Sequence, residues 1–470
     1  MQHTHRYDLV VVGGGPGGYT AAFRAADLGL SVCLVEQHAR LGGVCLNVGC
    51  IPSKTLLHGA TIIEEAEEAA AMGIGFAAPR IDLAALRAHK EGVVAKLTSG
   101  LDSLAKARKV SRLQGRASFG DAHTLRVRSD AGEEAVSFEH CILATGSRTS
   151  RLPGCPDDPR IWSSSDALAL KTVPKRLLII GGGIIGLEMA QVYHALGAEI
   201  TIVEMLEQII PPADKDLVQP LFLKLKKRYQ ILTRTRVEEI TAQAQGIRVR
   251  FAGPKAPEEG EYDAVLTAVG RRANSQELGL ESIGLEVDGQ GCIPVDRYQR
   301  SAIPHIYAIG DLVGEPMLAH KATHQGKVAA EVIAGLGSAF SPMTIPSVAY
   351  THPEVAWMGL NEKEAKEQGI DYSKGKFPWG ASGRALSSGA SAGVSKVLFA
   401  KESGRIIGAG ICGLNAGELI HEAVLALEMG ADAEDISRTV HAHPTLAETF
   451  ALAAEMVEGS ITDLMPPKKR

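Results

Sequence analysis

Two copies of one glycine pattern constrain the fold of this 470-residue chain more than any other feature. Each copy reads G-x-G-x-x-G, follows an apolar β-type run and precedes a helical run, and the copies occupy residues 13–18 and 181–186. In both, the next apolar strand ends in an acid, Glu36 or Glu204, eighteen positions after the last glycine of the copy. This matched spacing predicts two βαβ dinucleotide-binding units.

Each residue of the pattern has a physical task. The first glycine makes the strand-to-helix turn, the second lets a pyrophosphate approach the backbone at the helix start, and the third allows helix and strand to pack closely. The acid accepts hydrogen bonds from the adenosine ribose hydroxyls. In this order the glycines are Gly13, Gly15 and Gly18 in the first copy and Gly181, Gly183 and Gly186 in the second.

A pair of cysteines follows the first copy. Cys45 and Cys50 lie in the segment GGVCLNVGCIPSK, residues 42–54. A disulfide requires Cβ atoms about 3.5–4.5 Å apart, and a short glycine-bearing loop or a distorted helical turn can bring them there. The other five cysteines are scattered singly, so no second pair completes a four-ligand zinc site, and no metal is expected. Two inert thiols are the alternative, but the neighbouring nucleotide motif favours a redox-active dithiol.

Composition and charge narrow the class of protein. The length predicts three or four domains. The net charge of -5 argues against nucleic-acid binding, which requires a basic face. Seven cysteines fit a reducing compartment, and no secretory signal precedes the strand-like segment that starts at residue 7. The longest apolar run, residues 177–187, is too short to span a bilayer, so we expect a cytoplasmic protein that binds neither membrane nor nucleic acid.

Further segments surround the two copies. We expect helices at residues 64–71 and 83–107, strand-like elements at 141–146, 266–270 and 306–311, and a proline-bearing linker at 148–159. After about residue 345 the pattern changes to strands at 355–360, 395–400 and 406–411 and helices at 418–429 and 446–458. The predicted class is α/β, with two Rossmann-like dinucleotide-binding domains and a C-terminal α+β interface domain. The expected domains are residues 1–148, 149–270, 271–344 and 345–470, and residues 466–470 form a short basic tail.

These motifs together resemble those of the pyridine nucleotide–disulfide oxidoreductases, over about residues 7–464. The most specific are the dithiol segment, the sequence ADKD at 213–216, MLAHK at 317–321 and HAHPTLAE at 441–448. The resemblance implies reoxidation of protein-bound dihydrolipoyl groups through a redox-active disulfide and FAD, with hydride passed to NAD⁺. It also implies a homodimer whose partner is a lipoyl-bearing acyltransferase or carrier protein of a multienzyme complex, either a 2-oxo acid dehydrogenase or the glycine cleavage system.

The resemblance also implies the catalytic residues. Cys50 is expected to face the flavin, and Cys45 to exchange with the substrate. His443 is the expected base, oriented by Glu448, and together they reach the dithiol of the opposite subunit. A histidine suits this task because its ordinary pKa of about 6.5 allows either protonation state near neutral pH.

The remaining implied roles concern the cofactors. Lys54 is expected near flavin N5, with Glu188 as its ion-pair partner. The other expected FAD residues are Gly13, Gly15, Gly18, Glu36, Gly146 and Asp311. The expected NAD residues are Gly181, Gly183, Gly186 and Glu204, and Gly270 and Ala319 complete the cofactor sites.

Other family members are alternatives. Glutathione reductase uses NADPH, whose 2′-phosphate requires an arginine near the second acid. Here Met205 and Leu206 follow that acid and the next basic residue is Lys215, which favours NAD. A non-catalytic flavoprotein scaffold would lack one of the four catalytic residues, and all four are present. The sequence does not distinguish between the possible complexes, because all present the same lipoyl arm.

Overall fold

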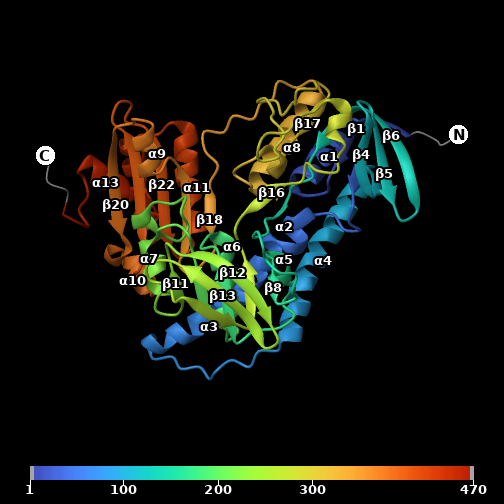
Figure 1. The fold of residues 1–470 in the computed structure, drawn as a ribbon. Coiled ribbons are helices and arrows are strands. Elements are labelled where there is room, and N and C mark those ends of the chain that lie inside the picture. The colour runs from blue at the N-terminus through green and yellow to red at the C-terminus, as the bar shows by residue number, and fades with distance from the viewer. Residues whose placement is uncertain (1–4, 466–470) are drawn as a thin grey trace.

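The computed structural model describes residues 5–465 and contains three main sheets (Figure 1). The first, on the right of Figure 1, has the order β3-β2-β1-β6-β5-β4, with β17 beside β6. Strands β3, β2, β1, β6 and β17 pair in parallel, whereas β4, β5 and β6 form an antiparallel meander. The strands are β1 (His5–Val12), β2 (Val32–Glu36), β3 (Ser111–Gln114), β4 (Arg116–Asp121), β5 (Thr124–Ser129), β6 (Gly132–Leu143) and β17 (Ile306–Ala308).

The second sheet repeats the centre of the first. Its order is β11-β10-β9-β15-β8 and all its pairs are parallel. In both sheets the strand before the glycines lies between the acid-bearing strand and a third parallel strand, so the predicted repeat is present in the topology. The strands are β8 (Ile161–Trp162), β9 (Arg176–Ile180), β10 (Glu199–Val203), β11 (Gln230–Leu232) and β15 (Ala264–Thr267). Two smaller sheets are antiparallel. One contains β12 (Arg236–Gln243), β13 (Gly246–Ala252) and β14 (Glu259–Tyr262), and the other pairs β7 (Ser147–Thr149) with β16 (Arg271–Ala273).

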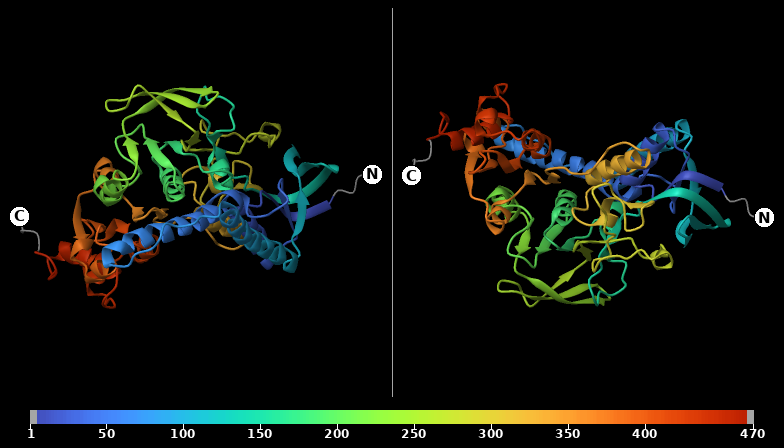
Figure 2. Two further views of the ribbon diagram at one scale, coloured as in Figure 1. Left: turned by 90° about the horizontal axis from the view of Figure 1, so that it is seen from below. Right: turned by 90° about the horizontal axis from the view of Figure 1, so that it is seen from above.

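The third sheet is antiparallel, with the order β18-β19-β22-β21-β20, and lies on the left of Figure 1. Helices α11 (Ala416–Met429) and α13 (Glu448–Glu458) pack on it. In both views of Figure 2, α3 (Cys50–Glu68) runs from the first sheet toward the third. The strands are β18 (Ser347–Ala349), β19 (Glu354–Gly359), β20 (Tyr372–Pro378), β21 (Val394–Ala400) and β22 (Ile406–Gly413).

Three of the four helices expected from the sequence agree with the structure, and the one expected at residues 64–71 differs. The helix expected at residues 83–107 is α4 (Leu83–Ala107), and the Asp82 side chain caps it by accepting hydrogen bonds from two N–H groups. The helix expected at 64–71 covers the end of α3 and part of the 3₁₀ helix Ala69–Met72, and α3 itself starts at Cys50, where Gly49 breaks the preceding turn. The remaining helices are α1 (Pro16–Asp27), α2 (Gly43–Val48), α5 (Ser164–Ala169), α6 (Ile184–Ala195), α7 (Lys215–Leu225), α8 (Ala319–Ile333), α9 (Glu362–Glu367), α10 (Gly383–Ser387) and α12 (Ala433–Arg438).

Other expectations have mixed outcomes. The C-terminal strands and helices lie within two residues of their expected positions. The expected linker at 148–159 begins inside β7, because that strand pairs with β16. The basic tail, residues 466–470, lies outside the described residues, and the four domain boundaries stay predictions. Between residues 5 and 465, no helix combines the length and apolar composition needed to cross a bilayer.

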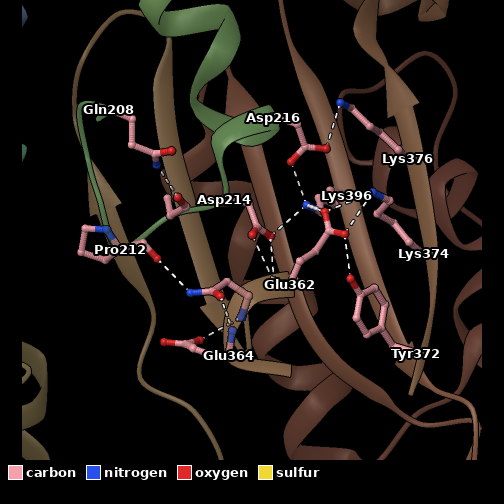
Figure 3. Close-up of polar contacts among 12 residues, drawn as sticks. Gln208, Pro212, Asp214, Asp216, Glu362, Glu364, Tyr372, Lys374, Lys376 and Lys396 are labelled. Atoms are coloured by element: carbon pink, nitrogen blue, oxygen red, sulfur yellow. Dashed lines mark hydrogen bonds and ion pairs between the residues drawn. The ribbon is translucent and has the colours of Figure 1, made fainter. Parts of the chain in front are cut away.

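A buried lysine joins α7 to the third sheet (Figure 3). Lys396 on β21 is 2% exposed and donates to Asp214 and Asp216 at 2.8 Å each, and also to Glu362. Asp214 immediately precedes α7 and Asp216 lies in its first turn, whereas Glu362 begins α9. The surrounding carboxylates compensate the cost of removing the ammonium from water. The ADKD motif therefore fixes the second unit on the third sheet.

We expect Lys396→Met to lower the free energy of unfolding by about 3 kcal/mol at neutral pH, because it leaves three carboxylates together without their shared cation. Burial opposes ionisation of Glu362, but hydrogen bonds from Lys396, Tyr372 and Lys374 lower its pKa to about 2. A depressed carboxyl pKa contributes stability above the unfolded-state value, and this contribution is lost as the pH falls through the folded-state value. The deficit of the variant should therefore shrink between about pH 4.5 and pH 2.

Thermal and denaturant unfolding followed by circular dichroism would measure this deficit. Lys374→Met is the matched control, because Lys374 contacts the same Glu362 carboxylate from an exposed position. Its effect should stay within about 1 kcal/mol. Equal deficits for the two variants would contradict a dominant role of the buried lysine.

Candidate active site

The two glycine turns are built from the same contacts. Gly13 and Gly181 have φ of +106° and +111°, in the region that favours glycine. A Cβ on Gly13 would lie 2.3 Å from the Ala144 oxygen, and one on Gly181 would lie 2.3 Å from the Ala268 oxygen. A Cβ on the third glycine of each copy would lie 1.8 or 2.2 Å from the oxygen of the first. Helix, turn and neighbouring strand therefore pack as closely as the fingerprint predicts.

The second glycine of each copy faces open space. Around a Cβ on Gly183 no described atom lies within 4 Å, and near Gly15 only the Gly43 Cα does, at 3.8 Å. Gly15 and Gly183 are the N-caps of α1 and α6, and no side chain caps either helix. Free N–H groups at an uncapped helix start attract phosphate, so both turns fit a bound pyrophosphate.

The two acids, predicted to bind ribose hydroxyls, also hold the glycine turns. Glu36 accepts hydrogen bonds from the backbone N–H groups of Gly14 (2.7 Å) and His38 (2.9 Å). Glu204 accepts from the equivalent two N–H groups of the second copy, at 2.8 and 2.7 Å. An ionised carboxylate accepts about four hydrogen bonds, so each retains capacity for hydroxyl donors. The sequence indicated the ligand-binding task but not this structural one.

A polar group surrounds Asp311 where β7 and β16 meet the first sheet. The Ser147 hydroxyl donates to Asp311, and Arg271 Nε donates to the Ser147 hydroxyl at 2.6 Å. Gly146 precedes this serine with φ of +69° and no described atom within 4 Å of a Cβ. Gly270, with φ of +113°, is equally open, and Ala319 is the first residue of α8. Gly146 and Gly270 thus lie at open turns, and Ala319 lies at a helix start.

Glycines also form the dithiol segment. A Cβ on Gly43 would lie 2.7 Å from the Gly15 Cα, so the segment packs directly on the first fingerprint. A Cβ on Gly49 would lie 2.8 Å from the Val44 oxygen and 3.2 Å from the Cys45 Cα. Gly49, between α2 and α3, therefore packs against the first turn of α2. The distorted helical turn that the sequence predicted as one possibility is the one observed.

The two thiols differ in acidity. Cys45 is half-buried, and Cys50 is exposed at the first position of α3. Although the residue Cys50 is exposed, its thiol is partly desolvated by its neighbours. A hydrogen bond from Cys45 and the nearby Lys54 ammonium outweigh this desolvation and lower the pKa of the Cys50 thiol to about 7. The same hydrogen bond, together with burial, raises the pKa of Cys45. A helix N-terminus also stabilises a thiolate, so Cys50 is the thiol that ionises first.

Lys54 and Glu188 form the predicted ion pair. Lys54 Nζ lies 3.0 and 2.9 Å from the two carboxylate oxygens of Glu188. The Glu188 side chain is 4% exposed, on the helix that follows the second fingerprint. The backbone N–H of Tyr350 donates to the same carboxylate at 3.1 Å. The pair therefore bridges α3 and α6 beside Cys50.

His443 and Glu448 form a second polar pair. His443 Nδ1 lies 2.9 Å from Glu448 Oε1, and the Thr445 N–H donates to Oε2 at 2.7 Å. Burial opposes ionisation of Glu448, but these two hydrogen bonds lower its pKa. The His443 side chain is 79% exposed. An oriented carboxylate therefore holds one ring nitrogen while the other faces outward.

The two halves of the candidate site do not meet within one chain. In Figure 1, α13, which begins with Glu448, lies at the outer edge of the third sheet. Helix α2, which carries Cys45, lies beside the first sheet, on the other side of several intervening elements. The structure thus brings Cys45, Cys50, Lys54 and Glu188 together and keeps the His443 pair apart from them.

An arginine that the sequence reasoning missed lies next to the second acid. Arg234 is thirty positions after Glu204, but its backbone N–H donates to the Leu206 oxygen at 2.8 Å. Its guanidinium pairs with Glu207 at 2.9 Å. Glu207 pairs with this cation, and the preference for NAD stays a prediction. Arg234 comes close to Glu204 because β10 and β11, the strands that precede these two residues, are paired, and the sequence alone does not show that pairing.

Two groups of metal-binding residue types come together between residues 5 and 465, and cations already contact both. Lys396 lies among the carboxylates of the first group, and Lys224 and Arg228 contact those of the second. The groups are Asp214, Asp216 and Glu362, and Glu64, Glu68 and His352. The Lys396 ammonium contacts all three members of the first group, and Lys224 and Arg228 pair with the two glutamates of the second.

Comparison with known proteins agrees with this geometry. The family model described as pyridine nucleotide-disulphide oxidoreductase matches residues 7–326, and its dimerisation domain matches residues 345–454. The chain is 55% identical to the dihydrolipoyl dehydrogenase of Haemophilus influenzae and 53% identical to that of Vibrio cholerae, covering 100% of this chain and 99% of each relative.

Solved structures show the same fold. LpdA from Mycobacterium tuberculosis superposes with a TM-score of 0.88 at 25% identity, covering 96% of this chain and 99% of that one. The Cu(II) complex of the HOCl-induced flavoprotein disulfide reductase RclA from Escherichia coli gives 0.86 at 26% identity, with 97% and 100% covered. The predicted fold class is confirmed. The chain therefore belongs to the pyridine nucleotide-disulphide oxidoreductase family.

Proposed function

We propose that the protein is a dihydrolipoamide dehydrogenase, which oxidises protein-bound dihydrolipoyl groups and reduces NAD⁺. The observation that carries the proposal is the placement of an acidic thiol, Cys50, beside the Lys54–Glu188 pair on a segment packed against the first fingerprint. Full-length relatives at 53–55% identity named dihydrolipoyl dehydrogenase support it.

The residues present fit the two cofactors that this activity requires. FAD would be held by the first fingerprint, Glu36, Asp311, Gly146 and the start of α8, and NAD by the second fingerprint, Glu204 and Gly270. Lys54 is assigned to the flavin side because it extends from the dithiol helix. Bound FAD supplies a two-electron acceptor for the dithiol, and NAD⁺ takes up the resulting hydride.

Thiol exchange assigns different tasks to the two cysteines. A dihydrolipoyl thiolate attacks Cys45 Sγ of the oxidised pair, the Cys45–Cys50 bond breaks, and Cys50 leaves as a thiolate. The second lipoyl thiolate then attacks its own mixed disulfide, releasing Cys45 and an oxidised lipoyl group. A thiol with a lower pKa leaves faster, so the acidic Cys50 suits the leaving role.

The His443–Glu448 pair serves as the base. The outward ring nitrogen accepts the proton of each lipoyl thiol, and Glu448 stabilises the imidazolium that forms. Because this pair lies apart from the dithiol of its own chain, we propose that it serves the partner subunit of a homodimer. The matched dimerisation domain supports a dimer.

The remaining parts of the proposal concern location and partners. The lipoyl substrate is carried by an acyltransferase or carrier protein of a multienzyme complex, either a 2-oxo acid dehydrogenase or the glycine cleavage system. The sparse cysteines support the cytoplasm as the compartment.

The purified protein should oxidise dihydrolipoamide with NAD⁺ and prefer NAD⁺ over NADP⁺ by more than about tenfold in kcat/KM, because Glu204 repels a 2′-phosphate. Glu204→Gln removes that charge but keeps an acceptor for the turn, so the preference should narrow. Adding Glu207→Gln, which frees Arg234, should narrow it further.

Steady-state kinetics with both nucleotides would measure this preference. An unaltered protein that treats the two nucleotides equally would contradict the nucleotide assignment. A protein inactive with dihydrolipoamide but active with oxidised glutathione and NADPH would contradict the proposed function.

Cys45→Ser and Cys50→Ser should each abolish dihydrolipoamide oxidation but differ in their absorbance spectra. A Cys50 thiolate beside flavin should give a long-wavelength band, which Cys45→Ser retains and Cys50→Ser loses. Visible absorbance of the purified variants would show the difference. The opposite pattern would mean that the two thiol roles are exchanged.

Mixing His443→Gln with Cys45→Ser protein, each inactive alone, should restore activity once the subunits exchange. Each mixed dimer then holds one site with both defects and one with none. The measurement is activity after subunit exchange, with heterodimer formation verified by differently tagged chains. Heterodimers that stay inactive would place both halves of the site in one chain.

A further inference from the structure

The turn between β18 and β19 is bound to α6 at two points. The Tyr350 N–H donates to Glu188 Oε1 at 3.1 Å, and the His352 N–H donates to Gln191 Oε1 at 2.8 Å. Glu188 and Gln191 are 3% and 1% exposed, and they share one face of the helix because they are three residues apart. Both anchors are buried, so the turn has a fixed position relative to the redox site.

The Tyr350 side chain faces the same site. The Lys54 ammonium lies 4.5 Å from the centre of the Tyr350 ring and within 3.0 Å of the Glu188 carboxylate. A cation over an aromatic face at this distance is attracted by the ring. A Cβ on Gly417, near the start of α11, would lie 3.5 Å from Tyr350 Cε1, so the ring rests against that helix. One ammonium is therefore held by a carboxylate of α6 and a ring from the C-terminal part of the chain.

The position of this ammonium matters for the dithiol. Lys54 is four residues after Cys50 on α3, so both side chains lie on one face of the helix. The charged and titratable groups around Cys50 are Cys45, Lys54, Glu188 and the Tyr350 hydroxyl. Glu354 on β19 lies within the electrostatic reach of Lys54, and Glu418 on α11 within that of Tyr350. Lys54 is the one cation among them. Its side chain is 34% exposed, so it can turn to solvent if its contacts are removed.

We propose that Tyr350 is a positioning residue of the redox site, whose ring holds the Lys54 ammonium beside Cys50. Through this residue, the segment matched by the dimerisation domain sets the reactivity of the dithiol in its own chain. The inference rests on the proposed function, in which Cys50 is the leaving thiol. The inference goes beyond the proposed function because it assigns a task to Tyr350, which takes no direct part in the exchange between the cysteines and the lipoyl thiols.

The test is a pH titration of Cys50 alkylation. All variants carry Cys45→Ser, so that Cys50 is the single thiol of the segment and a hydroxyl remains as its hydrogen-bond donor. The full-length protein reacts with iodoacetamide at a series of pH values, and mass spectrometry of the Cys50 peptide gives the rate at each. The variants are Tyr350→Leu, Tyr350→Phe and Lys54→Met, together with the double variant Tyr350→Leu/Lys54→Met.

Removing the ring should raise the midpoint of the titration by about half a pH unit, because the thiolate loses a nearby cation. Tyr350→Phe keeps the ring and should leave the midpoint unchanged. In the Lys54→Met background, Tyr350→Leu should cause no further shift, since the ring acts through the lysine. An unchanged midpoint in Tyr350→Leu would overturn the proposal, as would a shift that Tyr350→Phe shares or one that persists without Lys54.

The test can be read even if one variant does not fold, and its result does not depend on the proposed function. Tyr350 is 38% exposed, and Tyr350→Met offers a second ringless variant if Tyr350→Leu does not fold. The titration uses neither lipoyl substrate nor nucleotide. A protein that fails to oxidise dihydrolipoamide would contradict the proposed function while the titration still decides the role of Tyr350.

Discussion

The ion pair of Lys54 and Glu188 is the contact on which the rest of the site depends. Removing a carboxylate from water costs several kcal/mol unless a cation and hydrogen bonds compensate, and Glu188 has both. Its partners come from the dithiol helix and from the turn after β18. The two nucleotide-binding units and the C-terminal sheet therefore converge on one carboxylate. This convergence fixes the position of α3, which begins at Cys50.

The features predicted correctly from the sequence are those whose cause is local. A turn that leaves no room for a Cβ requires glycine at that position, so the pattern reports the backbone conformation directly. The duplicated fingerprint, the acid at the end of the next strand and the helix at residues 83–107 all have such local causes. The turn of the dithiol segment was also predictable, because Gly43 before Cys45 and Gly49 before Cys50 are required for steric reasons that the structure displays.

The features that the sequence did not predict depend on contacts between distant segments. Tyr350 and Arg234 follow the ends of strands and Lys396 lies within β21, and no local spacing marks any of them. Each acquires its role from a neighbour at least 27 positions away, such as Glu207 for Arg234. The structural role of the ADKD motif was hidden for the same reason, because its partner on β21 is 180 positions distant. Only the pairing of sheets and helices in three dimensions reveals such partnerships.

The lysine shared by Asp214, Asp216 and Glu362 limits how this architecture can be modified. The loop that follows Glu204, residues 205–213, leads directly into the carboxylates that hold Lys396. A nucleotide-binding unit grafted from a relative would therefore function here only if it brought compatible carboxylates to the same lysine. The nucleotide-binding unit and the C-terminal sheet can be exchanged only together. Substituting single side chains is therefore a simpler way to change the nucleotide specificity than replacing the whole unit.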